Sequence, residues 1–307
     1  MRNVEGQGKV NDIAEDDCII IGAGPAGLTA AIYLARYHLN IRLFDCGTSR
    51  AAMIPWTHNH AGFPGGISGK DLLARMSEQA RDFGVLREDK RVEHLAPVTG
   101  GFTVGTDSGA YRARSVLVAT GVYNHRPPEM DDALHDEALQ RGLLRYCPIC
   151  DGYELTDRRV AVIGSGEHGT AEAEFLRGYT QDITLIAPFH DHELDEECRA
   201  RLEAGGIATV AGPCGNYAIE ADLLTFDTAN GRMAFDSLYP ALGSHIRSEL
   251  AVGAGAKASE DGCLEVDEHL QTSVPGLFAA GDVVKGLDQI SHAMGQAGVA
   301  ATTIRNH

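Results

Sequence analysis

The stretch Cys18-Ile19-Ile20-Ile21-Gly22-Ala23-Gly24-Pro25-Ala26-Gly27 decides the fold of this chain. Its apolar first part is typical of a buried strand, and the glycines that follow predict a tight turn into a helix from Leu28 to about Leu39. In a turn of this kind Gly22 permits the sharp bend, Gly24 lets the backbone approach a pyrophosphate, and Gly27 lets the helix pack closely on the strand. The N–H groups at the start of the helix then bind the phosphates.

An acidic residue ends the next predicted strand, Ile41 to Asp45. It follows the first glycine by about 20 residues, the distance at which a carboxylate binds a ribose hydroxyl. A glycine-rich turn in an ordinary α/β protein is the alternative, but that alternative does not explain Asp45. The sequence therefore predicts a site for an adenine dinucleotide.

A second strand, glycine turn and helix are predicted at Arg159–Ile163, Gly164–Gly169 and onward to about Arg177. The next strand, Ile183–Ile186, ends at Ala187-Pro188-Phe189 rather than at an acid or a basic cluster. The repetition of this unit predicts an α/β fold with two Rossmann-like dinucleotide-binding domains.

The rest of the chain divides into apolar strands, amphipathic helices and loops. A long loop rich in glycine follows the first unit and can lie over a flat cofactor. The remaining expectations are a loop over Ser49–Gly69, a helix over Lys70–Phe83, antiparallel segments at Phe102–Val104 and Tyr111–Ala113, a buried strand over Ser115–Gly121, a linker over Tyr123–Pro128, a strand and turn at Phe278–Val283 and a helix from about Ile290 to Thr303.

Two cysteines lie one helical turn apart in Cys147-Pro148-Ile149-Cys150-Asp151-Gly152. We interpret them as a redox-active disulfide, because Cys147 can cap a helix that begins at Pro148, where the helix dipole favours a thiolate. The carboxyl of Asp151 is near enough to move a proton. A zinc half-site or inert cysteines remain the alternatives. A zinc ribbon needs a second pair, whereas the other cysteines are isolated: Cys18, Cys46, Cys198, Cys214 and Cys263.

Composition narrows the class of protein. A chain of 307 residues with 44% hydrophobic residues is long enough for two domains. The formal net charge of −17 argues against nucleic acid or an anionic membrane as a partner. No apolar run approaches the about 20 residues that span a membrane. Because Met1–Asp17 lacks the apolar core of a signal peptide, we expect a cytoplasmic protein.

Taken in order, the motifs resemble those of the low-molecular-weight thioredoxin reductases, FAD-dependent members of the pyridine nucleotide disulfide oxidoreductase class. The resemblance runs from about Asp17 to the end and rests on the first glycine turn, Ala119-Thr120-Gly121, the cysteine pair and Thr272–Asp282. It implies an FAD-binding domain in two pieces, 1–122 and 244–307, and an inserted nicotinamide-type domain, 123–243, that carries the disulfide. The cofactor-binding candidates are Gly22, Gly24, Pro25, Ala26, Gly27, Asp45, Asn59, Ala119, Thr120, Gly121, Gly281, Asp282 and Gln289.

The resemblance also implies a reaction. Reduced FAD passes two electrons to the disulfide, with Cys150 nearest the flavin, and Cys147 then attacks the disulfide of a partner. Asp151 serves as general acid for the departing thiolate. The expected partner is a thioredoxin-like protein or a small dithiol or disulfide. A rotation of the inserted domain about hinges near Tyr123 and Gly243, and a homodimer, are implied in the same way.

The chain departs from the family at the nicotinamide site. NADPH-dependent members carry a His-Arg-Arg stretch after the second strand of the inserted domain, whereas this chain has Ala187-Pro188-Phe189 and then acids up to Glu197. Each lost charge-assisted contact to the 2′-phosphate costs about 1.5–3 kcal/mol, so NADPH is a poor candidate. NADH is not excluded, although Ala187 replaces the acid it favours. Glu167 is expected to point negative charge toward a pyrophosphate.

Three functions remain open from sequence alone. The first is electron transfer between FAD and a protein dithiol, with a ferredoxin-type protein as a possible donor. The second is a dithiol oxidase that passes electrons from a small dithiol to oxygen. The third is a flavin-binding sensor or interaction protein with structural cysteines. The pairs His58/His60 and His190/His192 lack completing ligands, so no metal site is predicted.

Overall fold

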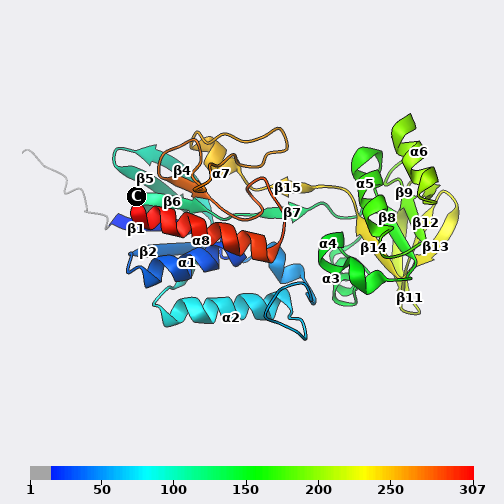
Figure 1. Cartoon of the computed structure of the whole chain (residues 1–307), viewed down its shortest axis with the longest axis horizontal. Coiled ribbons are helices and arrows are strands. Elements are labelled where there is room, and N and C mark those ends of the chain that lie inside the picture. Colours follow the sequence, from blue (N-terminus) through cyan, green and yellow to red (C-terminus); the bar gives the residue numbers. More distant parts are fainter. Residues whose placement is uncertain (1–14) are drawn as a thin grey trace, which may run out of the picture.

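The computed structural model describes residues 15–307, which form two lobes joined by a pair of short strands (Figure 1). Each lobe contains a sheet with a run of parallel strands flanked by helices, so the predicted α/β class with two Rossmann-like folds is confirmed. Most of the polar start, residues 1–14 of Met1–Asp17, lies outside the described residues. No helix within the described residues is long and apolar enough to cross a membrane.

The first lobe is built on a seven-stranded sheet with the order β3-β2-β1-β6-β5-β4, and β16 pairs with β6. β6 runs from Gly109 to Val118 as one strand, although two separate segments were predicted there. Its first half pairs with β5 antiparallel and its second half with β16 parallel, which accounts for the two different sequence patterns. The other strands are β1 (Glu15–Ile21), β2 (Ile41–Asp45), β3 (Arg87–Asp89), β4 (Val92–Val98), β5 (Gly101–Thr106) and β16 (Leu277–Ala279).

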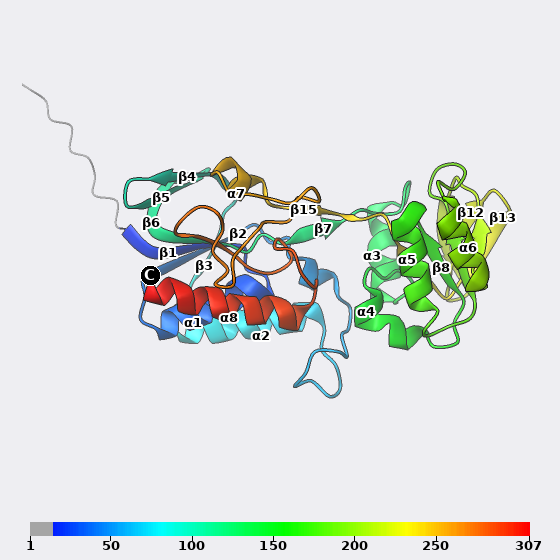
Figure 2. The same ribbon diagram turned by 45° about the horizontal axis from the view of Figure 1, so that its top comes forward.

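Figure 2 shows three long helices together on one side of this sheet: α1 (Pro25–Arg36), α2 (Gly69–Asp82) and α8 (Ile290–Asn306). α1 begins at Pro25, earlier than predicted, because Pro25 suits the first helical position. It ends at Arg36 rather than Leu39, since His38 takes a left-handed conformation with φ 62°. The other helices of this lobe are α7 (Glu249–Gly253) and the short η1 (Arg50–Met53).

The second lobe pairs a four-stranded parallel sheet, β10-β9-β8-β14, with a three-stranded antiparallel sheet, β11-β12-β13. Its strands are β8 (Val160–Ile163), β9 (Ile183–Ile186), β10 (Ala208–Val210), β11 (Gly215–Glu220), β12 (Leu223–Thr228), β13 (Gly231–Phe235) and β14 (Ser237–Pro240). Its helices are α3 (Asp132–Gln140), α4 (Pro148–Asp151), η2 (Gly152–Leu155), α5 (Gly166–Leu176) and α6 (Glu196–Ala204).

The two connections between the lobes are not simple linkers. β7 (Val122–Asn124) pairs antiparallel with β15 (Ser244–Ile246), so the start of the predicted linker Tyr123–Pro128 is a strand. The chain thus leaves and re-enters the first lobe at one place (Figure 1). This arrangement supports the proposed division into 1–122 with 244–307 and an inserted 123–243, whose boundaries stay a prediction.

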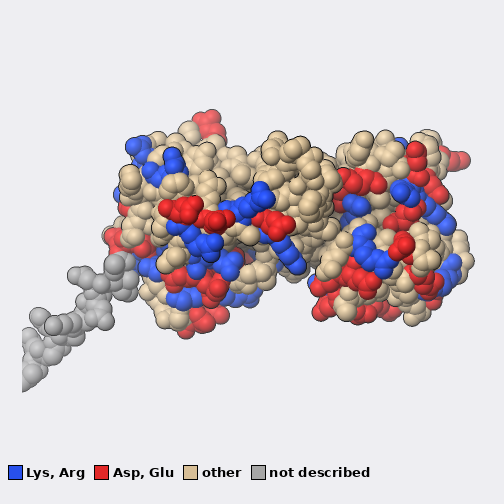
Figure 3. All heavy atoms as spheres, turned by 90° about the horizontal axis from the view of Figure 1, so that it is seen from below, with Lys and Arg blue, Asp and Glu red and all other residues tan. Residues whose placement is uncertain are grey.

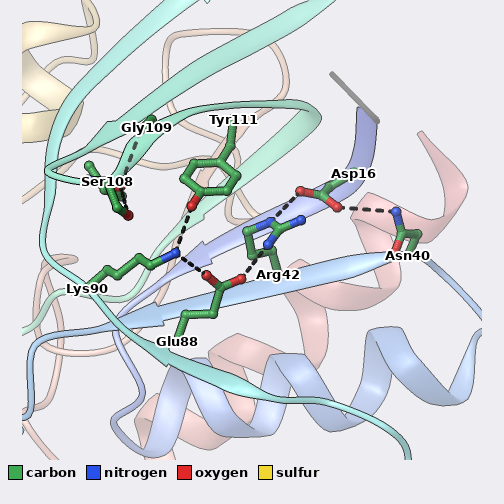
Figure 4. Close-up of polar contacts among 9 residues, drawn as sticks. Asp16, Asn40, Arg42, Glu88, Lys90, Ser108, Gly109 and Tyr111 are labelled. Carbon is green, nitrogen blue, oxygen red and sulfur yellow. Dashed lines mark hydrogen bonds and ion pairs between the residues drawn. The ribbon is translucent and has the colours of Figure 1, made fainter. Parts of the chain in front are cut away.

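A chain of polar contacts holds the edge of the first sheet together (Figure 4). Arg42 Nε lies 2.9 Å from Oδ2 of the buried Asp16, and its guanidinium also pairs with Glu88. Lys90 Nζ bridges Glu88, at 2.7 Å, and the hydroxyl of Tyr111, at 2.8 Å. Burial opposes ionisation of Glu88, but the hydrogen bonds from Lys90 and Arg42 outweigh it and lower the pKa of this carboxyl.

Glu88→Gln is expected to lower the free energy of unfolding by about 1 kcal/mol at neutral pH. Because the folded-state pKa of Glu88 is depressed, its contribution exists above the unfolded pKa and disappears as pH falls through the folded value. Urea unfolding at pH about 7 and about 4 measures this, and the difference between variant and wild type should shrink at the lower pH. Glu78→Gln, on the exposed side of α2, is the matched control. A difference that stays constant with pH would contradict the assignment.

Candidate functional site

A cavity of about 750 Å³ opens in the first lobe and extends to the second. Its volume lies in the range of small-molecule and cofactor sites. Gly27 is the one candidate outside its lining, and a Cβ there would lie 1.8 Å from the carbonyl oxygen of Gly22, in accord with its predicted packing role. The lining includes the candidates Gly22, Gly24, Pro25, Ala26, Asp45, Asn59, Ala119, Thr120, Gly121, Cys147, Cys150, Asp151, Gly281, Asp282 and Gln289.

The first glycine turn is shaped for close approach to the cavity. Gly22 has φ 107°, and a Cβ there would lie 2.3 Å from the carbonyl oxygen of Ala119, so the bend requires glycine. Gly24 precedes α1 as its N-cap residue and lines the cavity, and the nearest atom to a Cβ built there is Ser49 Oγ at 3.3 Å. The amino end of α1 therefore faces a space in which a phosphate has room.

Asp45, the acid at the end of β2, makes hydrogen bonds to the backbone of the protein. Asp45 Oδ1 accepts a hydrogen bond from the N–H of Ala23 at 3.0 Å, and Oδ2 accepts one from Gly47 at 3.0 Å. The carboxylate thus ties the end of β2 to the glycine turn while it lines the cavity. The contact to a ribose hydroxyl stays a prediction.

Asp282 is paired within the chain. Arg50 Nη1 lies 3.1 Å from Asp282 Oδ2 and 2.9 Å from Asp288 Oδ2, and all three residues line the cavity. Arg50 was not predicted from the sequence, because it is the first residue of η1 and meets the two acids only in the folded protein. Lys90 also lines the cavity and was likewise missed.

Cys147 and Cys150 form a disulfide with a Cα–Cα distance of 5.3 Å. Cys147 is the N-cap of α4 with Pro148 in the first turn, as predicted, and its Sγ accepts the N–H of Cys150 at 3.2 Å. α4 has only four residues, so its dipole favours a thiolate at Cys147 less strongly than we expected from the sequence. Among residues 15–307, no three His, Cys, Asp or Glu side chains gather as metal ligands.

Side chains of the first lobe reach the disulfide of the second. Gln289, the N-cap residue of α8, places Nε2 3.3 Å from the sulfur of Cys147 and 3.2 Å from that of Cys150. Its Oε1 accepts a hydrogen bond from Asn59 Nδ2 at 3.0 Å. Asn59 and Gln289, predicted separately from distant segments, therefore lie together and hold the sulfurs at the wall of the cavity.

Both carboxylate oxygens of Asp151 are occupied by neighbours. Arg145 Nη1 donates to Oδ2 at 2.9 Å, and the hydroxyl of Tyr239 donates to Oδ1 at 2.6 Å. Burial raises the pKa of Asp151, against the opposing effects of Arg145 and Tyr239. Neither partner was predicted from the sequence, since Tyr239 lies in the apolar strand β14 and its pattern is that of an ordinary core residue.

The second glycine turn contacts the loop that follows β9. Ser165 Oγ accepts the N–H of Glu193 at 2.7 Å, and a Cβ on Gly166 would lie 3.5 Å from the carbonyl oxygen of Glu193, an ordinary van der Waals distance. This loop is held further along by the N–H of Gly212, which donates to the carbonyl of His190 at 2.7 Å.

Glu167 does not point freely toward a pyrophosphate site, which corrects the expectation from sequence. Arg201 Nη1, from α6, lies 2.6 Å from Glu167 Oε2. The same guanidinium binds Glu174 at 2.5 Å, so one arginine fastens α6 across two turns of α5. Arg201 lies 34 residues beyond Glu167, which is why the sequence pattern did not reveal the pair.

Acidic and basic side chains are interleaved on both lobes on the face shown in Figure 3.

Comparison with known proteins identifies the family. A sequence model for pyridine nucleotide-disulphide oxidoreductases matches residues 16–297. The chain belongs to this family. It is 29% identical to thioredoxin reductase of Listeria innocua, over 95% of this chain and 93% of that protein, and 32% identical to thioredoxin reductase of Mycolicibacterium smegmatis, over 87% and 88%. The crystal structure of thioredoxin reductase from Streptococcus pyogenes superposes with a TM-score of 0.86 at 25% identity, covering 96% of this chain and 98% of that one.

Membership confirms the resemblance drawn from the motifs. This pyridine nucleotide-disulphide oxidoreductase is thioredoxin-reductase-like and is a flavin-dependent disulfide oxidoreductase. The roles of individual residues, the reductant and the partner are taken up as proposals.

Proposed function

We propose that the protein passes electron pairs between bound FAD and a partner dithiol through Cys147 and Cys150, without a nicotinamide bound in its second lobe. The observation that carries this proposal is the disulfide at the wall of the large cavity, with both sulfurs in contact with Gln289. The partner we propose is a thioredoxin-like protein, because the relatives are named for that substrate.

The first-lobe cavity fits FAD. Its glycine turn leaves room for phosphates beside Gly24, Asp45 lines the cavity and is our proposed ribose contact, and the cavity continues to the sulfurs. Arg50, Asp282 and the amino end of α1 would hold the polar parts of the dinucleotide. FAD, when bound, supplies the two-electron store with which the disulfide exchanges.

The chain's own groups perform the exchange with the partner. The thiolate of Cys147 attacks the partner's disulfide, so one S–S bond forms as another breaks, and the departing sulfur takes a proton from Asp151. Cys150 then attacks Cys147, which restores the internal disulfide and releases the reduced partner. We assign to Gln289 the positioning of both sulfurs at the cavity.

The second lobe supplies the argument against a nicotinamide donor. The loop that follows β9 lies beside its glycine turn, the place for a pyrophosphate, and the N–H of Glu193 donates to Ser165 Oγ in that turn. A main-chain hydrogen bond from Gly212 to His190 holds this loop. Ala187, at the end of β9, offers neither an acid for NADH nor a cation for NADPH.

Anaerobic addition of NADPH or NADH is expected to leave the flavin absorbance near about 450 nm unchanged, whereas dithiothreitol bleaches it. The measurement is stopped-flow absorbance on the purified flavoprotein, with an NADPH-dependent thioredoxin reductase as positive control. Rapid bleaching by either nucleotide would overturn the proposal that the second lobe does not use a nicotinamide.

The lack of an acid or a cation at Ala187 also favours a second candidate. If no nicotinamide delivers electrons, a dithiol itself can be the donor. Electrons would then pass from the dithiol through the disulfide and FAD to oxygen, in the opposite direction. Aerobic mixing with a dithiol distinguishes the two, because only this dithiol oxidase turns over continuously and forms hydrogen peroxide. A ferredoxin donor is less favoured, since the chain carries a formal net charge of −17 and ferredoxins are commonly acidic.

A further inference from the structure

We propose that Arg145 keeps Asp151 ionised while the disulfide is intact, so that this carboxylate accepts the proton of the thiol that opens the disulfide. The inference rests on the function proposed for Cys147, Cys150 and Asp151, and deepens it. Arg145 is a positioning residue, because its side chain donates hydrogen bonds to Asp151 and to the main chain at Gly142 rather than to the sulfurs.

The ion pair between Arg145 and Asp151 is largely shielded from solvent. Arg145 Nη1 lies 2.9 Å from Asp151 Oδ2, and the two side chains are only 16% and 19% exposed. Water and salt screen such a pair less than a pair on the surface, and removing one partner leaves the other charge without a counterion. Because an arginine keeps its proton in proteins, its contact with Oδ2 always favours the carboxylate form of Asp151.

The strand β14 places both hydrogen-bond donors against Asp151. The N–H of Arg145 donates to the carbonyl oxygen of Leu238 at 2.9 Å, and the hydroxyl of the next residue, Tyr239, donates to Asp151 Oδ1 at 2.6 Å. Arg145 Nε donates to the carbonyl oxygen of Gly142 at 3.0 Å. A Cβ at Gly142 would lie 2.7 Å from Arg145 Nη2, so this glycine leaves room for the guanidinium. The fold therefore fixes Arg145 where it meets the carboxylate.

The other groups around Asp151 make Arg145 necessary. Burial raises the pKa of Asp151, and Arg145 and the hydroxyl of Tyr239 oppose this effect. The charge of Glu154, on η2, acts in the same direction as burial. Burial and the charges of Asp151 and Glu172 raise the pKa of Tyr239, so the phenol remains a donor. Within residues 15–307, Arg145 is the cation within ion-pair distance of Asp151, and its removal would increase the proton affinity of this carboxylate.

An ionised Asp151 balances the opening of the disulfide. A thiol attacks the sulfur of Cys147, its proton passes to Asp151, and the bond between Cys147 and Cys150 breaks with its electron pair on Cys150. When the thiol belongs to a dithiol, its second sulfur then closes the dithiol's own disulfide. Cys147 departs and takes the proton of Asp151, and the second thiol proton goes to water. One disulfide is exchanged for another, and Asp151 returns to its carboxylate form.

The test compares wild type with Arg145→Gln in the flavin-loaded protein. Reduction of the flavin by dithiothreitol is followed anaerobically by stopped flow from pH about 5 to about 9, and the ratio of the two rates cancels the ionisation of dithiothreitol itself. Loss of the cation favours the protonated form of Asp151, so the variant has less carboxylate at acidic pH. Wild type should be at least about threefold faster at the acidic end, and the ratio should fall toward one at the alkaline end.

Three further variants make the test decisive. Arg145→Lys keeps the positive charge and should recover most of the wild-type pH profile. In an Asp151→Asn background, Arg145→Gln should have no pH-dependent effect, because the carboxylate on which it acts is missing. Arg141→Gln, at the C-terminal end of α3, removes an arginine that pairs with Glu137 instead, and should match wild type. A ratio that does not change with pH, or one that persists in Asp151→Asn, would overturn the proposal while leaving the proposed function intact.

Infrared spectra of the oxidised protein titrate Asp151 without turnover. The carboxylic acid band that is missing in Asp151→Asn should be absent from wild type at about pH 7 and appear on acidification. It should appear at a higher pH in Arg145→Gln and, by a smaller margin, in Tyr239→Phe. A band present in wild type at neutral pH would overturn the proposal, even where Arg145→Gln does not fold. If dithiothreitol does not reduce the wild-type flavin, the proposed function fails, and this titration still decides whether Asp151 is ionised.

Discussion

Replacing Cys147 or Cys150 by serine is expected to abolish reduction of the bound FAD by dithiothreitol, a loss of at least about a thousandfold. The two sulfurs form the disulfide at the cavity wall, and serine offers no sulfur through which an electron pair can pass. Stopped-flow absorbance of the flavin, measured anaerobically, gives the rate directly.

Cys263→Ser is the matched control, since Cys263 is a free cysteine outside the cavity lining. It should reduce at the wild-type rate. Flavin reduction that survives in Cys147→Ser and Cys150→Ser would instead favour the third function, a flavin-binding sensor whose cysteines are structural.

Gly24→Val is expected to strip the protein of most of its FAD during purification. Gly24 lines the cavity at the amino end of α1, and a branched side chain there fills the space that a pyrophosphate needs. Losing two charge-assisted hydrogen bonds at about 1.5 kcal/mol each weakens binding at least about a hundredfold. The measurement is the ratio of flavin to protein absorbance, followed by titration of the apoprotein with FAD.

Gly295→Val is the control for this change. A Cβ at Gly295 on α8 would meet no atom within 4 Å, so the variant should retain FAD. Wild-type FAD affinity in Gly24→Val would show that the pyrophosphate does not lie at the first glycine turn. Circular dichroism of both variants separates loss of cofactor from loss of fold.

Local patterns in the sequence were enough to predict the fold class. The run Cys18–Ile21 is apolar because it lies inside a sheet, and glycines must follow it because a Cβ at Gly22 would strike Ala119. The apolar run and the glycine turn each occupy only a few consecutive residues and can therefore be recognised in the sequence. The ends of helices were less predictable. α1 ends at Arg36 because His38 adopts a left-handed conformation, and the helix propensities of the residues there do not predict this change.

The two glycine turns illustrate where sequence reasoning stopped. Both have the same spacing, yet the first lines a large cavity, whereas the second is bonded to the loop at Glu193. The absence of basic residues after Ile186 already argued against NADPH. The pairing of Arg201 with Glu167 could not be predicted from the sequence, because that contact depends on how α6 packs across α5.

The amino-acid sequence by itself determined two Rossmann-like units, a cysteine pair with a neighbouring acid, and the lack of a basic cluster for a 2′-phosphate. Only the tertiary structure decided which residues contact the cysteines and their neighbouring acid. Gln289 donates hydrogen bonds to both sulfurs, and Arg145 and Tyr239 donate hydrogen bonds to Asp151. The reason is physical. Turn and strand patterns arise from forces between near neighbours, whereas Gln289 and Cys147 lie 142 positions apart and meet only once both lobes have folded and docked.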